Sequence, residues 1–373
     1  IGIGFKTADR IAREGGLDPG SPARFAAALD HCLDEAGNDG HCFLTREQLL
    51  DQAWMLLDPG NPEAALDAAG RQGLEAELDR EIRRGRYAVD VPDEAEGVTT
   101  FDPGPGDHIY LWRMWRAEQS AAAHLLALSG GGQDEGGAGG SGIGNSSGEP
   151  LTARELEAAY GARVDAAAVM LSFKPAAAQR EAALRFMVEP VLVLTGIPGS
   201  GKTATLRLIL ATLQQPEHEV LLCAPTGRAA RRMSEQTGMP ASTIHAALQL
   251  DPETNEMPDE PLQKDTVIVD EASMMDIQLF DRLLRRLKPG CRLLLSGDPY
   301  QLPSVGPGNV LIDVISSGVI PVVRLTELFR QHKGSVIAAN AARIRQGDTN
   351  LTYNETCAFV TANSAEDAAA KIH

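Results

Sequence analysis

The stretch VLVLTGIPGSGKT, residues 191–203, decides the fold of this chain. Its first half is an unbroken apolar run, which predicts a buried strand at Val191–Thr195. Its second half, residues 196–203, fits the pattern G-x-x-x-x-G-K-[ST] in full. Glycines let the backbone curl so that its N–H groups point at phosphate oxygens, and the following helix adds its positive end. The stretch therefore predicts a phosphate site between a strand and a helix that begins at Gly201.

The residues of this loop are candidate nucleotide ligands. We expect Lys202 to bridge the β- and γ-phosphates and Thr203 to hold Mg²⁺ through its hydroxyl. A chance match on a glycine-rich turn is the alternative, but the flanking strand and helix are the context that phosphate binding requires. The predicted set is Gly196, Ile197, Pro198, Gly199, Ser200, Gly201, Lys202, Thr203 and Ala204.

Polar side chains follow two further apolar runs. Thr266–Val269 is followed by Asp270, a predicted magnesium ligand, and Glu271, a predicted activator of the attacking water. An Asp-Glu pair could also open a solvated helix, but the phosphate loop favours the catalytic interpretation. Arg292–Ser296 leads to Gln301, which could sense the γ-phosphate. Lys202, Glu271 and Gln301 are thus the candidate catalytic residues.

Strands and helices alternate throughout this half of the chain. A strand is predicted at Val220–Ala224 and a helix from Gly227, in addition to the strands above. Such alternation is typical of an α/β protein with a parallel sheet and helices on both faces.

Residues 1–128 are mainly helical in pattern. Ser21 and Pro22 predict a helix start, and Thr45 with Gln48 forms a capping box. A third helical stripe follows at residues 74–82, then two strand-like runs at 86–91 and 108–112 and an alanine-rich helix to residue 128. Three helices and a two-stranded ribbon suit a winged-helix arrangement, which could contact DNA. Residues 129–150 contain ten glycines and predict a flexible linker.

Composition bounds the remaining possibilities. The net charge is −17, but residues 1–150 hold 12 basic and 26 acidic side chains, so the second half is nearly neutral and suits local DNA contacts better. The apolar runs are too short to span a membrane. Five scattered cysteines without a C-x-x-C pair favour a reducing cytoplasm and no structural zinc. The chain begins at Ile1 and is expected to be a piece of a longer protein.

Six motifs in order resemble those of superfamily-one helicases, and more narrowly the RecD-like branch with its stand-alone bacterial members. They cover residues 173–347, with weaker similarity in residues 1–128. The motifs are GIPGSGKT at 196–203, APTGRAA at 224–230, TIH at 243–245, DEASM at 270–274, GDPYQLP at 297–303 and LTELFRQ at 325–331.

The resemblance implies roles that spacing alone does not give. Gln179 is similar to a glutamine that reads adenine, and Arg330 to an arginine finger from a second RecA-like domain. Residues 250–262 occupy the place of a small hairpin that splits the duplex. Travel is expected to be 5′ to 3′. The residues implied to contact DNA, including a helix-hairpin-helix remnant at residues 2–8, are Gly2, Gly4, Thr226, Gly227, Arg228, Thr243 and His245. Without the resemblance, the two threonines would be helix caps.

The resemblance also implies the domain plan and the activity. Residues 151–320 are expected to form the first RecA-like domain and residues 321–373 the truncated start of a second. Because later motifs are missing, these residues alone are expected to turn over ATP weakly and not to unwind DNA. The implied activity is that of a monomeric ATP- and Mg²⁺-dependent helicase acting on single-stranded DNA and duplex junctions. An ATP-switched DNA-binding module is the alternative; a GTPase is disfavoured because no N-K-x-D segment is present.

Overall fold

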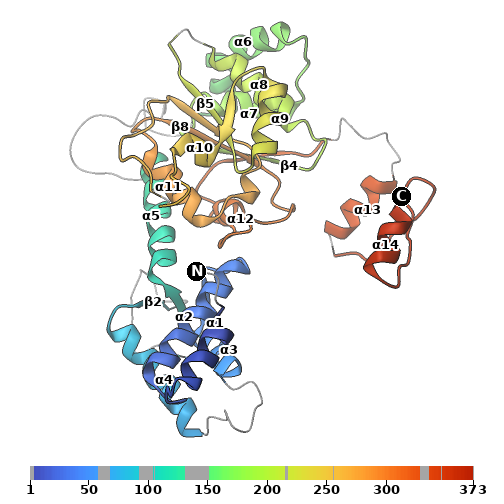
Figure 1. Ribbon diagram of the computed structural model, residues 1–373. Coiled ribbons are helices and arrows are strands. Elements are labelled where there is room, and N and C mark those ends of the chain that lie inside the picture. Colours follow the sequence, from blue (N-terminus) through green and yellow to red (C-terminus); the bar gives the residue numbers. More distant parts are fainter. Residues whose placement is uncertain are drawn as a thin grey trace.

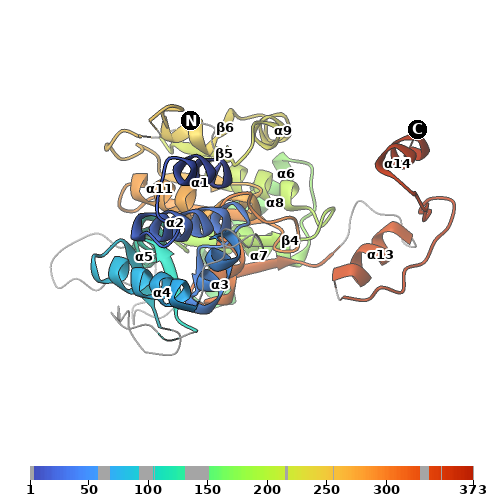
Figure 2. The same ribbon diagram turned by 60° about the horizontal axis from the view of Figure 1, so that its bottom comes forward.

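The computed structural model describes residues 4–57, 68–91, 104, 106–130, 151–214, 217–254, 256–327, 336–345 and 347–372. Its first part is a small helical lobe with one sheet (Figures 1 and 2). The elements of this lobe are α1 (Phe5–Glu14), α2 (Pro22–Asn38), β1 (Phe43–Thr45), α3 (Arg46–Leu57), α4 (Ala68–Arg83), β2 (Tyr87–Asp90) and β3 (His108–Leu111).

Local signals in the sequence set the helix starts of this lobe. The Ser21 hydroxyl accepts a hydrogen bond from the Arg24 N–H, and Pro22 occupies the first turn of α2. Thr45 and Gln48 form the reciprocal capping box that the sequence predicts, at 3.1 and 3.2 Å. Arg24 also binds Asp9 of α1 at 2.6 Å, and this ion pair holds α1 against α2.

The lobe has the element order of a winged helix. The order after α1 is helix, strand, helix, helix, strand, strand, and the three strands pair antiparallel in the order β1-β3-β2. The two predicted strands are present as β2 and β3. The sequence interpretation missed β1, because a strand of three residues carries almost no alternation.

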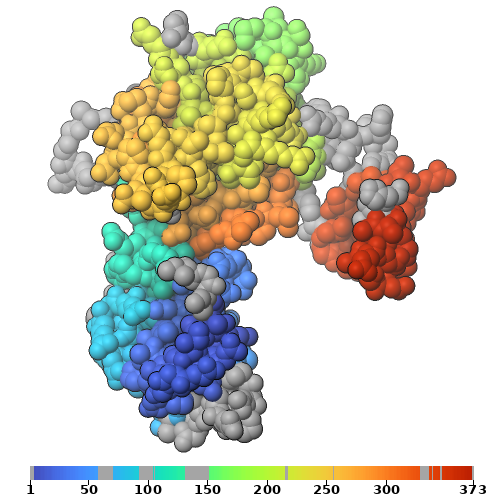
Figure 3. Space-filling view, viewed as in Figure 1, coloured from blue at the N-terminus to red at the C-terminus, as the bar shows by residue number. Residues whose placement is uncertain are grey.

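Helix α5 (Trp112–Leu128) connects this lobe to the rest of the chain (Figure 1). Met114 near its start packs in the core of the helical lobe. Ala121 and Leu125 pack in a second core with α11 (Ile277–Arg286). The lobe and the sheet domain therefore share one helix. In the space-filling view of Figure 3, the teal atoms of this part of the chain lie between the lobe and the sheet domain. The predicted linker lies outside the described residues except for Ser129 and Gly130.

The second part is built on a six-stranded parallel sheet in the order β6-β5-β7-β8-β4-β9. Ladder pairs such as Val191 with Leu293 and Val220 with Thr266 set its register. The strands are β4 (Val191–Gly196), β5 (Val220–Ala224), β6 (Ala241–Thr243), β7 (Thr266–Val269), β8 (Arg292–Gly297) and β9 (Val322–Leu325).

Helices cover both faces of this sheet, as predicted. Alternate strand residues face opposite layers: Leu192 and Leu194 join one core, while Val191 and Val193 join the other. The helices and the one 3₁₀ turn of this part are α6 (Ala153–Met170), α7 (Ala177–Phe186), α8 (Lys202–Leu213), α9 (Gly227–Thr237), α10 (Ile244–Leu248), η1 (Ala272–Met274), α11 and α12 (Val310–Ser316). This is the α/β fold that the sequence predicts.

Two features of the expected domain plan look different in the structure. Residues 322–325, placed by the sequence interpretation in the second domain, form the edge strand β9 beside β4, so a second domain can begin only after Leu325. Between residues 250 and 262 the described residues form turns, closed by a hydrogen bond from the Asp251 N–H to the Glu256 carbonyl, and no strand ladder.

The last described segment contains two helices, α13 (Val336–Arg345) and α14 (Ala365–Ile372). Asn340 of α13 is buried and its amide bonds to both the N–H and the carbonyl of Thr352. This side chain fixes the extended segment that follows α13.

Candidate nucleotide site

The loop between β4 and α8 requires three glycines. Gly199 and Gly201 have φ of +86° and +89°, a conformation that side chains with a Cβ strain to adopt. A Cβ at Gly196 would lie 2.9 Å from the Cβ of Leu325 and closer still to the Ser200 hydroxyl. These three positions therefore have no room, or no suitable backbone conformation, for a side chain. Helix α8 begins directly after the loop, at Lys202.

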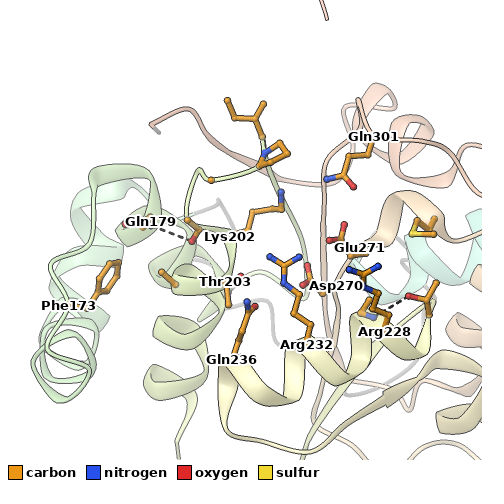
Figure 4. A pocket seen from close by; sticks show the side chains of 18 residues that line it. Phe173, Gln179, Lys202, Thr203, Arg228, Arg232, Gln236, Asp270, Glu271 and Gln301 are labelled. Carbon is orange, nitrogen blue, oxygen red and sulfur yellow. Dashed lines mark hydrogen bonds between the residues drawn. The ribbon is translucent and has the colours of Figure 1, made fainter. Parts of the chain in front are cut away.

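This loop lines a cavity of about 770 Å³, a size that suits a small-molecule ligand (Figure 4). The carboxyl ends of β4, β5 and β7 and the loop after β8 open into it. The residues predicted for the nucleotide site that line the cavity are Gln179, Ile197, Pro198, Gly199, Gly201, Lys202, Thr203, Ala204, Asp270, Glu271 and Gln301. Ser200 is instead buried beneath the loop.

Lys202 and Thr203 occupy the first turn of α8. The Lys202 ammonium donates a hydrogen bond to the Gly196 carbonyl and so lies folded along the loop. Both side chains are partly exposed to the cavity. A phosphate bound by the loop would lie at the positive end of α8 and within reach of this ammonium.

Asp270 stands at the carboxyl end of β7. Its Oδ1 accepts a hydrogen bond of 2.8 Å from the Ser296 hydroxyl of β8, which fixes the carboxylate at the cavity floor. In the described part of the chain, no cluster of three or more His, Cys, Asp or Glu could hold a metal ion. One carboxylate with one hydroxyl can be the protein share of a magnesium site that phosphates and waters complete, and Asp270 and Thr203 both line this cavity.

Glu271 has the most unusual environment in the cavity. Its backbone is left-handed, with φ of +53° and ψ of +41°, which costs a non-glycine residue about 1–3 kcal/mol. Its Oε2 is buried and makes no hydrogen bond within the described structure. Burial, and then the neighbouring Asp270 carboxylate, raise the pKa of Glu271 above its usual value, against the effect of Lys202. A strained, unpartnered acid with a raised pKa fits a group that receives a proton from water.

Gln301 reaches the same cavity from the loop after β8. Hydrogen bonds from the Gln301 N–H to the Asp298 carbonyl and from the Tyr300 N–H to the Asp298 carboxylate fold this loop. In Figure 4 the Gln301 amide lies on the side of the cavity where Glu271 is found.

Gln179 and Phe173 lie at the opposite end of the cavity. Gln179 is only 2% exposed, accepts a hydrogen bond from the Ala176 N–H at 2.9 Å and donates one to the Gly201 carbonyl at 3.4 Å. It therefore ties the start of α7 to the phosphate loop. Its reading of adenine stays a prediction. The sequence interpretation did not single out Phe173, whose ring offers a flat apolar surface for a base.

The residues expected to contact DNA divide between two places. Thr226 and Arg228 line the nucleotide cavity. Gly227 and Thr243 line a separate groove between α9, β6 and α10, which we call the second groove. The Thr226 and Thr243 hydroxyls cap α9 and α10, as expected of threonines at these positions.

Two other expected DNA contacts, His245 and Gly4, line neither place. His245 is exposed on α10. Gly4 precedes α1 in the helical lobe. Gly2 and Arg330 lie outside the described residues.

The cavity also contains two polar residues that the sequence interpretation missed. Arg232 and Gln236 line it, one and two helical turns after Arg228 on α9. The spacing of four residues between these positions was the available signal, because it places all three side chains on one face of a helix.

Comparisons with known proteins can now be set beside this geometry. The AAA domain family matches residues 174–364, and the HHH domain of ATP-dependent RecD2 DNA helicases matches residues 1–43. The chain belongs to the RecD-like branch of these P-loop proteins. The resemblance read from the six motifs is thereby confirmed, as is the helical N-terminal part followed by a P-loop domain.

Two relatives in sequence agree with this membership. The ATP-dependent RecD2 DNA helicase of Deinococcus radiodurans is 33% identical over 357 residues, which cover 93% of this chain and 44% of the relative. The RecBCD enzyme subunit RecD of Mycolicibacterium smegmatis is 33% identical and covers 66% of this chain and 44% of that subunit. A Bacteroides Pif1 structure bound to single-stranded DNA aligns with 51% of each chain, with 20% identity and a TM-score of 0.37. The chain thus spans less than half the length of the RecD-like relatives.

Within the described residues, no helix is both long enough and apolar enough to pass through a lipid bilayer.

Proposed function

We propose that this chain contains the first motor domain of an ATP-dependent DNA helicase. One observation carries the proposal: Lys202, Thr203, Asp270 and Glu271, up to 69 residues apart in the sequence, line a single cavity at the carboxyl edge of one sheet. The left-handed glycines of the loop and the unpartnered Glu271 oxygen fit a magnesium nucleoside triphosphate. The RecD-like membership supports DNA as the polymer on which the motor acts.

Each residue then has a defined task. The loop N–H groups and Lys202 bind and orient the phosphates, and Thr203 and Asp270 would hold Mg²⁺, which supplies charge neutralisation when bound. Glu271 accepts the proton of the attacking water, and its raised pKa suits that transfer. Phe173 and Gln179, at the other end of the cavity, give the base its place, and Gln179 favours adenine.

The second groove and the turn region at residues 250–262 handle the strand in this proposal. The expected ligands are the backbone phosphates of single-stranded DNA and of single–double-strand junctions. We further propose a monomeric cytoplasmic enzyme that travels 5′ to 3′, with Arg330 completing the site from the second domain.

The test uses the full-length protein and its Lys202→Ala variant. Loss of the ammonium is expected to lower DNA-stimulated ATP hydrolysis about a hundredfold or more, while DNA binding without nucleotide persists. Arg207→Ala, an exposed cation on the same helix, is the matched control and should retain activity. Near-normal hydrolysis by Lys202→Ala would refute the nucleotide site.

Strand displacement on a forked duplex separates the helicase from its rival. A helicase separates the strands only with hydrolysable ATP. An ATP-switched DNA-binding module would bind the fork and respond to ATP without separating its strands, and that result would overturn the helicase proposal.

A further inference from the structure

Helix α9 forms a wall shared by two openings. Arg228, Arg232 and Gln236 face the nucleotide cavity. Gly227, Arg231 and Ser234 face the second groove, together with Thr243 across from them. The same helix of 11 residues therefore touches the expected phosphate site on one side and an expected DNA site on the other.

Adjacent arginines on this helix have different environments. Arg231 pairs with Glu235 at 3.0 Å, an i,i+4 contact along the exposed side of the helix. Arg232 makes no hydrogen bond or ion pair with any described residue, although two carboxylates lie in the cavity that it lines. Its guanidinium is therefore available to bind an anionic group in the cavity.

The direction of Arg232 is defined by the cavity. In Figure 4 its side chain rises from α9 between Thr203 on one side and Asp270 and Glu271 on the other. Its charge is close enough to Glu271 to lower the pKa of that carboxyl, as the charge of Lys202 also does. Arg232 therefore lies at the end of the cavity with the carboxylates, away from Phe173 and Gln179.

We propose that Arg232 binds the terminal phosphate of the nucleoside triphosphate and is a phosphate-sensing residue supplied by the same domain. The inference rests on the proposed nucleotide site. The terminal phosphate must lie beside Glu271, because the attacking water lies between the two. A diphosphate lacks that group, so Arg232 distinguishes the two nucleotides. A guanidinium is suited to this task because it can bind two phosphate oxygens at once.

The consequence for the motor follows from the position of Arg232. Arg232 lies on α9, one helical turn after Arg228. When its guanidinium binds the terminal phosphate, it pulls α9 toward the phosphate loop. Because α9 also forms a side of the second groove, the groove receives the nucleotide state through a rigid helix.

The test compares Arg232→Gln with Arg207→Gln, which removes an exposed cation of α8, in the full-length protein. Equilibrium binding of a fluorescent non-hydrolysable ATP analogue and of fluorescent ADP is measured, each with Mg²⁺. Loss of a charged hydrogen bond predicts roughly tenfold to hundredfold weaker binding of the triphosphate analogue by Arg232→Gln. ADP affinity should stay within about twofold, because a diphosphate does not reach Arg232. Arg207→Gln should change neither affinity, and Arg232→Lys should restore part of the loss.

The outcomes separate this inference from the proposed function. If Lys202→Ala abolishes binding of both nucleotides but Arg232→Gln binds the triphosphate normally, the site stands and the role of Arg232 is wrong. An equal loss of both nucleotides in Arg232→Gln, with an unchanged melting temperature, would also overturn the sensing role. If the unmodified protein binds neither nucleotide, the proposed function itself fails.

Discussion

Replacing Glu271 by glutamine should separate catalysis from stability in this site. Glu271 combines a left-handed backbone, a buried oxygen without a hydrogen-bond partner and an acidic neighbour, Asp270. The burial of its oxygen and the acidic neighbour make the ionised side chain unfavourable in the folded protein, whereas the backbone conformation is the same for glutamine. Glutamine keeps nearly the same shape but cannot ionise or accept the proton of the attacking water. The variant should therefore lose activity and gain stability.

Both effects have an expected size. Removal of a general base lowers turnover by about 10²–10⁴. The cost of a buried polar atom without a partner is about 1–3 kcal/mol and larger when the group is charged. Since the amide keeps part of that cost, a gain of about 1 kcal/mol in the free energy of unfolding is a reasonable expectation, or about 2–4 °C in melting temperature.

The pH dependence gives the sign. Because the pKa of Glu271 in the folded protein is raised, its favourable contribution is complete only below the usual glutamate pKa. That contribution is lost as the pH rises through the raised value. The gain of Glu271→Gln over the unmodified protein should thus grow from acidic to neutral pH and then level off.

Two quantities are measured. One is DNA-stimulated ATP hydrolysis, and the other is thermal unfolding without nucleotide at several pH values. Glu181→Gln serves as control, since Glu181 is an exposed acid paired with Arg185 on α7 and should change neither quantity measurably. A Glu271→Gln variant that melts well below the unmodified protein would refute the reasoning. It would show that Glu271 supports the turn at η1 and that its strain has another origin.

Two further substitutions test the architecture around the site. Gly196→Ala should cost about 1–3 kcal/mol of stability and abolish nucleotide binding, because the added Cβ meets Ser200 and Leu325. Calorimetry with and without the triphosphate analogue measures the stability and the binding. A stable variant that binds the analogue normally would contradict the close packing. Burial raises the pKa of Glu118 in α5, so the unmodified protein should lose stability as the pH rises from acidic to neutral and Glu118 ionises. Glu118→Gln should not show this loss. Parallel stability–pH curves for the variant and the unmodified protein would show that Glu118 does not ionise in this range.

The strands that carry the site were predictable almost to the residue. The predicted Val220–Ala224 and Thr266–Val269 coincide with β5 and β7, while β4 and β8 each extend one residue further. These strands are buried on both faces, so their sequences are continuous apolar runs bounded by polar loops. The short strands β1 and β6 lacked that signal.

The end of the first domain was harder to predict, for a physical reason. The strand β9 has only four residues, Val322–Leu325, with Arg324 among them, and it joins the sheet at an edge. Its place is decided by long-range pairing, in which Gly196 lies opposite Leu325. Neither periodicity nor composition reveals such a partner, and the motif order suggested a new domain instead.

Within the site, the grouping of residues was predictable but their conformation was not. The residue types and spacing of the phosphate loop predicted a set of residues, most of which line one cavity. The backbone strain at Glu271 and the lack of an ion-pair partner for Arg232 depend on residues that are distant in the sequence, so the motifs do not reveal them. The two threonines show the opposite case, because the capping interaction expected of each is present and leaves its contact with DNA a separate question.

The register of the parallel sheet explains how motifs so far apart in sequence can line one cavity. Thr195 lies opposite Gly297, and Val269 lies opposite Leu295, so the strands β4, β7 and β8 end within a residue or two of one another. A slip of one residue would turn every side chain of a strand to the other face and move Asp270 away from Ser296. The loops between the strands can vary in length without changing this register. The number of residues between each buried strand and the polar site residue that follows it cannot vary. Short fixed spacings behind apolar runs are therefore the part of such a sequence that specifies the site.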